Sequence, residues 1–164
     1  SKKVSPTKKD EFTSRSQLKQ LYIRNIISIK TIQKHTDRSI VFRPHPRCPL
    51  PDIEREFKNV YRQVPNKLAG TYDDFDMKFD NIWATISWSS NPGIHSIING
   101  VPAFVSNSSL AYPVANDIDF LHDIEDPHMG GRQAWLNDYA HTEYTVDEIA
   151  KGIPLTNLLD QITS

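Results

Sequence analysis

The chain has little cysteine and glycine, and it lacks any long apolar run. It holds one cysteine, Cys48, among 164 residues, which excludes an internal disulfide framework and favours a reducing compartment. No apolar stretch approaches the roughly 20 residues that span a membrane, and no signal peptide is visible. We therefore expect a cytoplasmic protein without a membrane span. The six glycines form no Walker loop, no G-x-G-x-x-G motif and no G-x-S-x-G elbow.

A metal or cofactor is not expected either. The histidines do not fall into metal-ligand spacing, and His45 with Cys48 has no second pair that would complete a zinc site. The acidic run over residues 73–76 shows no clear ligand geometry, so a solvated loop is the favoured interpretation. No visible motif requires a divalent metal.

Net charge is unevenly distributed along the chain. Residues 1–47 hold twelve Lys and Arg against three Asp and Glu, a net charge of +9, although the whole chain carries −1. A basic N-terminal third indicates an anionic partner, namely a nucleotide, a nucleic acid or an acidic surface. A solvated helix face followed by a basic tail explains the same charge, and both interpretations stay open.

The pattern predicts an α/β fold that is Rossmann-like, with a small and mostly parallel sheet flanked by helices. Residues 1–9 form a flexible basic tail, and residues 10–164 form a single domain. We expect strands near residues 40–43, 60–62, 82–87 and 102–105. We expect helices over residues 10–36, 52–58, 132–139, 145–151 and 154–162, and a helical turn over residues 117–124. Thr145 and Glu148 form a capping box at the start of one of these helices.

The rest of the chain is organised around residues 82–105, which read as strand, turn, helix and strand. Ser89, Ser90 or Asn91 serves as the N-cap of the short helix, and Pro92 suits its first position. Such a turn offers backbone N–H groups and the positive end of a helix to a phosphate. A well-capped helix without a ligand is the alternative. A second hydroxyl-rich turn, with Ser106 and Ser108, follows the next strand.

A stiff basic loop follows the strand near residues 40–43. Two X-Pro steps hold Arg43 and His45 in extended backbone, so that Arg43, His45 and Arg47 point to the same side. Two guanidinium groups and an imidazole there form a candidate grip for a phosphate or carboxylate. The alternative is a rigid exit loop with solvated arginines.

Two motifs carry a resemblance to a known family: Arg43-Pro44-His45-Pro46 and Ser89-Ser90-Asn91-Pro92-Gly93. Together they resemble the nucleotide-sugar-binding half of GT-B-type glycosyltransferases, and especially the bacterial sialyltransferases and capsule-polysaccharide transferases. Residues 36–155 further resemble glycosyltransferase-like proteins of bacteria and phages, through the order and spacing of short motifs that include Arg132-Gln133-Ala134-Trp135-Leu136. The resemblance implies that His45 contacts the donor phosphate region and that Ser89 and Ser90 contact the phosphate.

These observations predict the donor-binding half of a glycosyltransferase, which moves a sugar from a nucleotide sugar to a glycan acceptor. His45 is the candidate catalytic residue, because an imidazole can protonate the leaving phosphate. The candidate nucleotide- and phosphate-binding residues are Arg43, His45, Arg47, Ser89, Ser90, Asn91, Gly93, Ser106 and Ser108.

Three points stay open. The chain has room for one of the two GT-B domains, so the acceptor half is missing from it, or another subunit supplies it, or the chain is a donor-binding remnant without catalysis. A phage-type enzyme that glycosylates a hydroxymethylated DNA base is an alternative, favoured by the basic N-terminal third. A non-catalytic nucleotide-binding or protein-interaction module is another.

Overall fold

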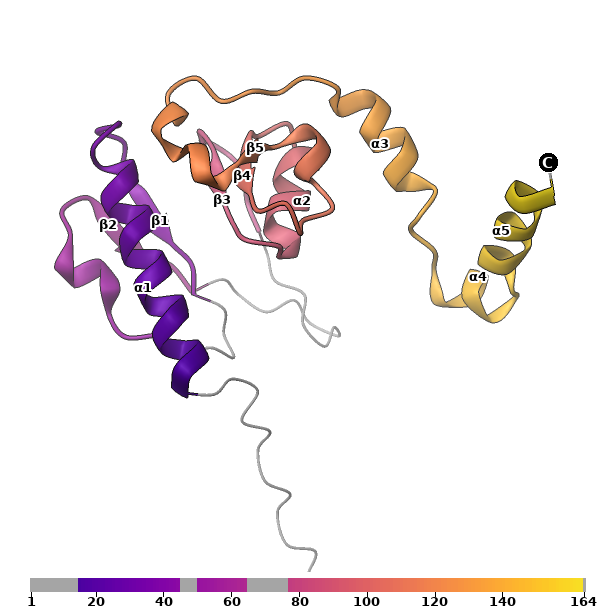
Figure 1. Cartoon of the computed structure of the whole chain (residues 1–164), viewed down its shortest axis with the longest axis horizontal. Helices are drawn as coiled ribbons and strands as arrows, with labels where there is room; N and C mark the ends of the chain where they lie inside the picture. Colours follow the sequence, from indigo (N-terminus) through magenta and orange to yellow (C-terminus); the bar gives the residue numbers. More distant parts are fainter. Residues whose placement is uncertain (1–14, 45–49, 65–76, 164) are drawn as a thin grey trace, which may run out of the picture. The chain divides into compact units, whose positions relative to one another are not determined.

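The computed structural model describes residues 15–44, 50–64 and 77–163 (Figure 1). The chain divides into two compact units. Unit 1 comprises the chain up to Asn81 together with Asp119–Asp126, and unit 2 comprises Ile82–Ile118 and the chain from Pro127 onward. The single domain over residues 10–164 stays a prediction, and the tail over residues 1–9 and the acidic run over 73–76 lie outside the described residues.

All paired strands of the described chain are parallel, and they form two small sheets. In unit 1, β1 (Ile40–Phe42) pairs with β2 (Val60–Arg62). In unit 2, the order is β3 (Thr85–Ile86), β4 (Ala103–Val105) and β5 (Asn116–Asp117). The predicted α/β class is therefore confirmed, with small parallel sheets flanked by helices, and the Rossmann-like topology stays a prediction. The prediction of one sheet is wrong, because hydrogen bonds join β1 only to β2 and join β3 to β4.

Unit 1 is built around α1 (Arg15–Ile32), which lies within the predicted helix over residues 10–36. Its apolar residues recur at three- and four-residue steps, and Ile29 is buried against Val60 of β2 and Ile53 of the 3₁₀ helix η1 (Ile53–Glu56). The short helix predicted near 52–58 is therefore present as a single 3₁₀ turn. Tyr22 and Phe42 are among the half-buried side chains around this small core.

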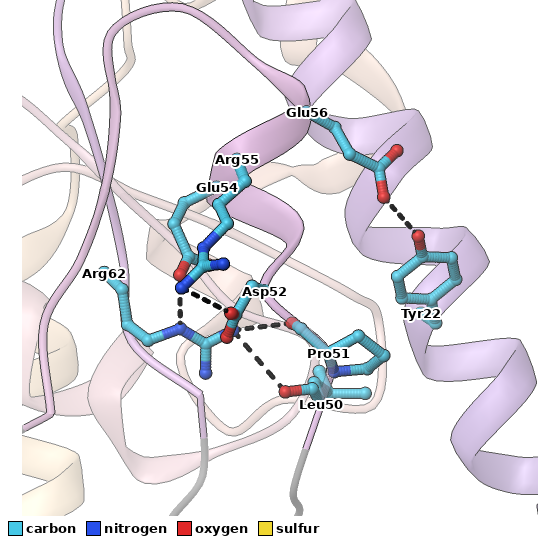
Figure 2. A network of polar contacts seen from close by, with 8 residues as sticks. All are labelled: Tyr22, Leu50, Pro51, Asp52, Glu54, Arg55, Glu56 and Arg62. Carbon is cyan, nitrogen blue, oxygen red and sulfur yellow. Dashed lines mark hydrogen bonds and ion pairs between the residues drawn. The ribbon is translucent and has the colours of Figure 1, made fainter.

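A polar network fastens the segment before β2 to the strand itself (Figure 2). Arg62 donates from Nε to Glu54 at 2.8 Å and from Nη2 to the Pro51 carbonyl at 2.6 Å. Its guanidinium carbon also lies 5.5 Å from the ring centre of Phe42, a cation–π arrangement. On the α1 side, Tyr22 donates to Glu56 at 2.5 Å. The planar guanidinium group of Arg62, with its several N–H donors, suits this site. A lysine at position 62 would satisfy fewer of these acceptors.

We expect low pH to destabilise unit 1, because Glu54 then becomes protonated. The hydrogen bond from Arg62 holds the pKa of Glu54 below its ordinary 4.5. Because the unfolded chain takes up this proton more readily, the ionised carboxylate stabilises the fold above about pH 4.5, and that contribution is lost as the pH falls through the lowered pKa. Glu54→Gln should therefore lower the urea midpoint at pH 7 and lose less stability than the unchanged protein between pH 7 and pH 3.

Circular dichroism in urea at the two pH values measures this difference. Glu56→Gln is the matched control on the same 3₁₀ turn, because an amide oxygen still accepts the Tyr22 hydroxyl. An equal loss of stability on acidification in the unchanged protein and in Glu54→Gln would contradict the assignment.

The segment Asp119–Asp126 belongs to unit 1 and is held there by Glu125. Arg38 donates to both carboxylate oxygens, from Nε at 3.1 Å and from Nη2 at 3.0 Å, and the Thr36 hydroxyl donates to the same group. The 3₁₀ helix η3 (Ile118–Asp123) leads into this segment and matches the helical turn predicted over residues 117–124. The bidentate pair fixes the turn after α1 against a segment that is distant in sequence.

Unit 2 packs α2 (Asn91–Ile98) against the three-stranded sheet (Figure 1). Every residue of β4 is buried, as expected for the central strand. Ile94 and Ile97 of α2 form a core with Ala103 and Val105 of β4, and Val114 of the 3₁₀ helix η2 (Tyr112–Val114) completes it. The strand–turn–helix–strand pattern predicted over residues 82–105 is therefore present, with β3 and β4 parallel.

Three further helices follow: α3 (Arg132–Ala140), α4 (Val146–Ala150) and α5 (Ile153–Thr163). The predicted capping box is confirmed, since Thr145 accepts from the Glu148 N–H and Glu148 accepts from the Thr145 N–H. Gly152 ends α4 with φ of +74°, a conformation that favours glycine. Among the described helices, none is long and apolar enough to cross a membrane.

Candidate functional site

Two hydroxyl-rich turns lie next to each other in unit 2, at the edge where β3 and β4 end. The Ser106 N–H donates to the Trp88 carbonyl at 2.9 Å, and the Ser106 hydroxyl donates to the same oxygen at 3.2 Å. This pairing continues the parallel register of β3 and β4 beyond the strands. The turn that begins at Ser89 and the turn that begins at Ser106 therefore leave the sheet side by side.

We call Ser89, Ser90, Ser106 and Ser108 the hydroxyl edge. Ser89, Ser90 and Ser108 are exposed, and Ser106 is half-buried. The Ser106 and Ser108 oxygens lie 2.7 Å apart and share a hydrogen bond. Ligands of open α/β sheets bind at the carboxyl ends of the strands, and a hydroxyl both donates and accepts. The hydroxyl edge is therefore suited to the oxygens of a phosphate or a sugar.

The start of α2 offers fewer backbone donors than the sequence predicts. Ser90 occupies the N-cap position, but its side chain makes no capping hydrogen bond. Pro92 stands at the second helical position rather than the first, since the helix begins at Asn91, and proline has no N–H. The Gly93 N–H already donates to the Ser90 carbonyl at 3.1 Å. Of the predicted cradle, Asn91 and the two serines remain exposed.

Gly93 has a packing role in this structure. It is buried, and a Cβ atom placed on it would lie 2.7 Å from the Ser87 hydroxyl oxygen and 2.8 Å from a methyl of Val105. Both distances are shorter than van der Waals contact allows. Glycine therefore lets α2 approach the sheet closely, whether or not a ligand binds at its start.

The predicted basic grip falls in unit 1, and the structure describes one of its three residues. Arg43 follows β1, is half-buried, and donates from Nε to the Gln63 side chain, which follows β2, at 2.8 Å. His45 and Arg47 lie outside the described residues. The grip, its joining with the hydroxyl edge and the catalytic role of His45 therefore stay predictions.

Sequence reasoning missed two side chains of α3, Arg132 and Trp135, which contact the end of α2 and the segment after Ser106–Ser109. Arg132 donates from Nε to the Ile97 carbonyl and from Nη2 to the Ile98 carbonyl, each at 2.6 Å. The Trp135 indole N–H donates to the Leu110 carbonyl at 3.1 Å. Both residues stand in a motif that carries the family resemblance, but their acceptors are 25 to 35 residues away in sequence, and spacing within the helix does not reveal them.

Next to this pair, Tyr139 stacks on Trp135 with ring centres 5.0 Å apart and planes 13° apart. A hydrogen bond with the Glu143 carboxylate, and then burial, raise the pKa of Tyr139 to about 12. The phenol is therefore neutral at physiological pH, and it packs on Trp135.

Within the described ranges, no three His, Cys, Asp or Glu side chains are grouped so that they could hold a metal ion. The sequence matches no protein-family model, and searches of the curated proteins and of the solved structures found no match. The candidate site therefore has to be interpreted from its own chemistry.

Proposed function

We propose that this chain is the nucleotide-sugar-binding half of a GT-B-type glycosyltransferase. One observation carries the proposal: the pairing of Ser106 with Trp88 brings two hydroxyl-rich turns together at the carboxyl edge of a parallel sheet. Such an enzyme stabilises the departing nucleotide phosphate with aligned donors and positive charge. The hydroxyl edge supplies donors for that phosphate. Arg43, His45 and Arg47, which belong to unit 1, stay a separate predicted grip for an anion, with His45 as the predicted catalytic residue.

A thermal-shift titration against CMP-, UDP-, GDP- and TDP-sugars, with and without a divalent cation, tests this function. We expect one nucleotide class to raise the melting temperature, since a ligand at about 100 times its Kd stabilises the folded state by about 2.7 kcal/mol. Metal is expected to have no effect on that shift. No stabilisation by any of the four classes contradicts the proposal.

Variants separate the site from the scaffold. Ser89→Ala and Ser90→Ala, which remove exposed hydroxyls, should weaken nucleotide-sugar binding about tenfold each, the loss of one hydrogen bond to a charged phosphate. His45→Ala should abolish nucleotide-sugar binding and leave the melting temperature nearly unchanged. Thr156→Ala, which removes an exposed hydroxyl at the start of α5, is the matched control and should bind normally.

A DNA acceptor is the second candidate, and the charge of α1 favours it. The helix carries basic side chains, of which Lys19 and Lys30 are exposed, and no acidic residue. Phosphate contacts dominate DNA affinity and weaken steeply with salt. Duplex DNA binding that falls between 50 and 200 mM salt (~3–5 decades for 6–10 phosphate contacts) supports this acceptor. Absent or salt-independent binding favours a glycan.

A further inference from the structure

The C-terminal end of α2 is held by one side chain from another helix. The last carbonyls of any α-helix lack partners within the helix. In α2 the Ile97 and Ile98 carbonyls accept from Arg132 Nε and Nη2, each at 2.6 Å. Guanidinium donors have a fixed relative geometry, and a positive charge is favoured at this end of a helix dipole. Arg132 therefore fixes both the position and the direction of the end of α2.

The turn after α2 is shaped around the same guanidinium. Gly100 has φ of +78°, and a Cβ atom on it would lie 3.4 Å from Nη1 of Arg132. A side chain at position 100 is disfavoured by the backbone conformation, and its Cβ atom would be in van der Waals contact with Arg132. The approach of Arg132 to the carbonyls is thus part of how this helix ends.

One turn further along α3, Trp135 holds the second turn of the hydroxyl edge. Its indole N–H donates to the Leu110 carbonyl at 3.1 Å. Leu110 directly follows Ser106–Ser109, where the Ser109 N–H donates to the Ser106 carbonyl at 3.0 Å and the Ser109 hydroxyl accepts from the Ala111 N–H at 3.2 Å. The indole is itself fixed, because it packs against the core of unit 2 and stacks on Tyr139.

We infer that α3 braces the hydroxyl edge, with Arg132 and Trp135 as positioning residues. Arg132 sets α2, whose other end carries Ser89 and Ser90, and Trp135 sets the turn with Ser106 and Ser108. An eight-residue helix is about 12 Å long and rigid, so a displacement at its end moves its start. As a statement about ligand binding, the inference rests on the proposed function, because it takes the hydroxyl edge as the binding site.

The first arm of the test uses no ligand. Amide hydrogen exchange is measured in the unchanged protein, Arg132→Gln, Arg132→Lys and Trp135→Phe. We expect Arg132→Gln to speed exchange in α2, and Trp135→Phe, which keeps the ring but loses the N–H, to speed exchange at the Ser106 and Ser109 amides. The Ile40 and Gln63 amides of unit 1, which donate to Asn59 and Phe42, should not change. Gln133→Ala, an exposed neighbour on α3, is the matched control.

The second arm measures nucleotide-sugar affinity. Arg132→Gln and Trp135→Phe should weaken it about tenfold. Arg132→Lys, which keeps the charge but has a single donor nitrogen, should be intermediate. A residue that serves only general stability would change exchange throughout unit 2 and leave affinity intact. That result would contradict the inference that α3 positions the hydroxyl edge. So would hydrogen-exchange rates in Gln133→Ala that equal those in the other variants. If the unchanged protein binds no nucleotide sugar, the proposed function fails while the exchange arm still decides whether α3 braces the edge.

Discussion

Replacing Ile97 with alanine is expected to lower the free energy of unfolding of unit 2 by about 2–5 kcal/mol. The Ile97 side chain is fully buried, and it packs in the core formed by α2, β4 and η2. Truncation loses the transfer free energy of the removed carbons. It also leaves a cavity, which closes only in part because the sheet beneath α2 is held by its own hydrogen bonds.

The measurement is urea unfolding followed by tryptophan fluorescence. All three tryptophans, Trp83, Trp88 and Trp135, belong to unit 2, so this signal reports unit 2 separately from unit 1. The matched control is Ile98→Ala, the next residue of the same helix, whose side chain is 38% exposed. Both variants change helix propensity equally, so their difference isolates burial. Ile98→Ala should cost less than about 1 kcal/mol, and equal losses in the two variants would contradict the assigned core.

Local signals in the sequence identified most elements of the described fold. Three- and four-residue apolar steps marked α1, a capping box marked the start of α4, and short apolar runs marked β1 and β4. These signals act between neighbours in the chain, so they are readable without the tertiary structure.

Pairing between strands that are distant in sequence could not be predicted from such local signals. β5 was missed because Asn116–Asp117 is short and polar. This strand is held by contacts with residues that are distant in sequence. The Asn116 side-chain amide donates to the Ala103 carbonyl at 3.1 Å, and the Asn116 side-chain oxygen accepts from the His128 N–H at 2.7 Å. The division into two sheets also escaped prediction, since a strand of two or three residues carries no mark of its partner.

At the candidate site, composition located the two serine turns, and the parallel order of β3 and β4 placed them together. What the sequence did not reveal was which local groups were already engaged. Arg43 is bonded to Gln63, the Gly93 N–H to Ser90, and Arg132 to the end of α2. Each of these contacts joins groups whose proximity depends on the folded backbone, so residue type alone could not distinguish a ligand-binding donor from a structural one.

Gly93 is where a binding role and a packing role make opposite predictions, and we expect Gly93→Ala to destabilise unit 2 by about 2 kcal/mol. Overpacking a buried site costs typically about 1–3 kcal/mol, and the higher helix propensity of alanine returns about 1 kcal/mol. The new Cβ atom meets two groups, at 2.7 and 2.8 Å, so the overpacking cost at this site should lie near the upper end of that range. His95→Ala, an exposed position of the same helix, is the control and should not destabilise.

The two groups that the Cβ atom meets differ in how far they can yield. The Ser87 hydroxyl makes no hydrogen bond within the described part of the chain, so it can rotate away. The Val105 methyl is fixed, because its side chain is fully buried in the core of unit 2. The conflict with Val105 should therefore dominate. In a double-mutant cycle, Gly93→Ala with Val105→Ala should lose less stability than the sum of the single losses, by about 0.5–3 kcal/mol. Additive losses would place the strain elsewhere. If Gly93→Ala instead keeps full stability and loses nucleotide-sugar binding, Gly93 serves the ligand, and the close packing of α2 on the sheet is not its reason.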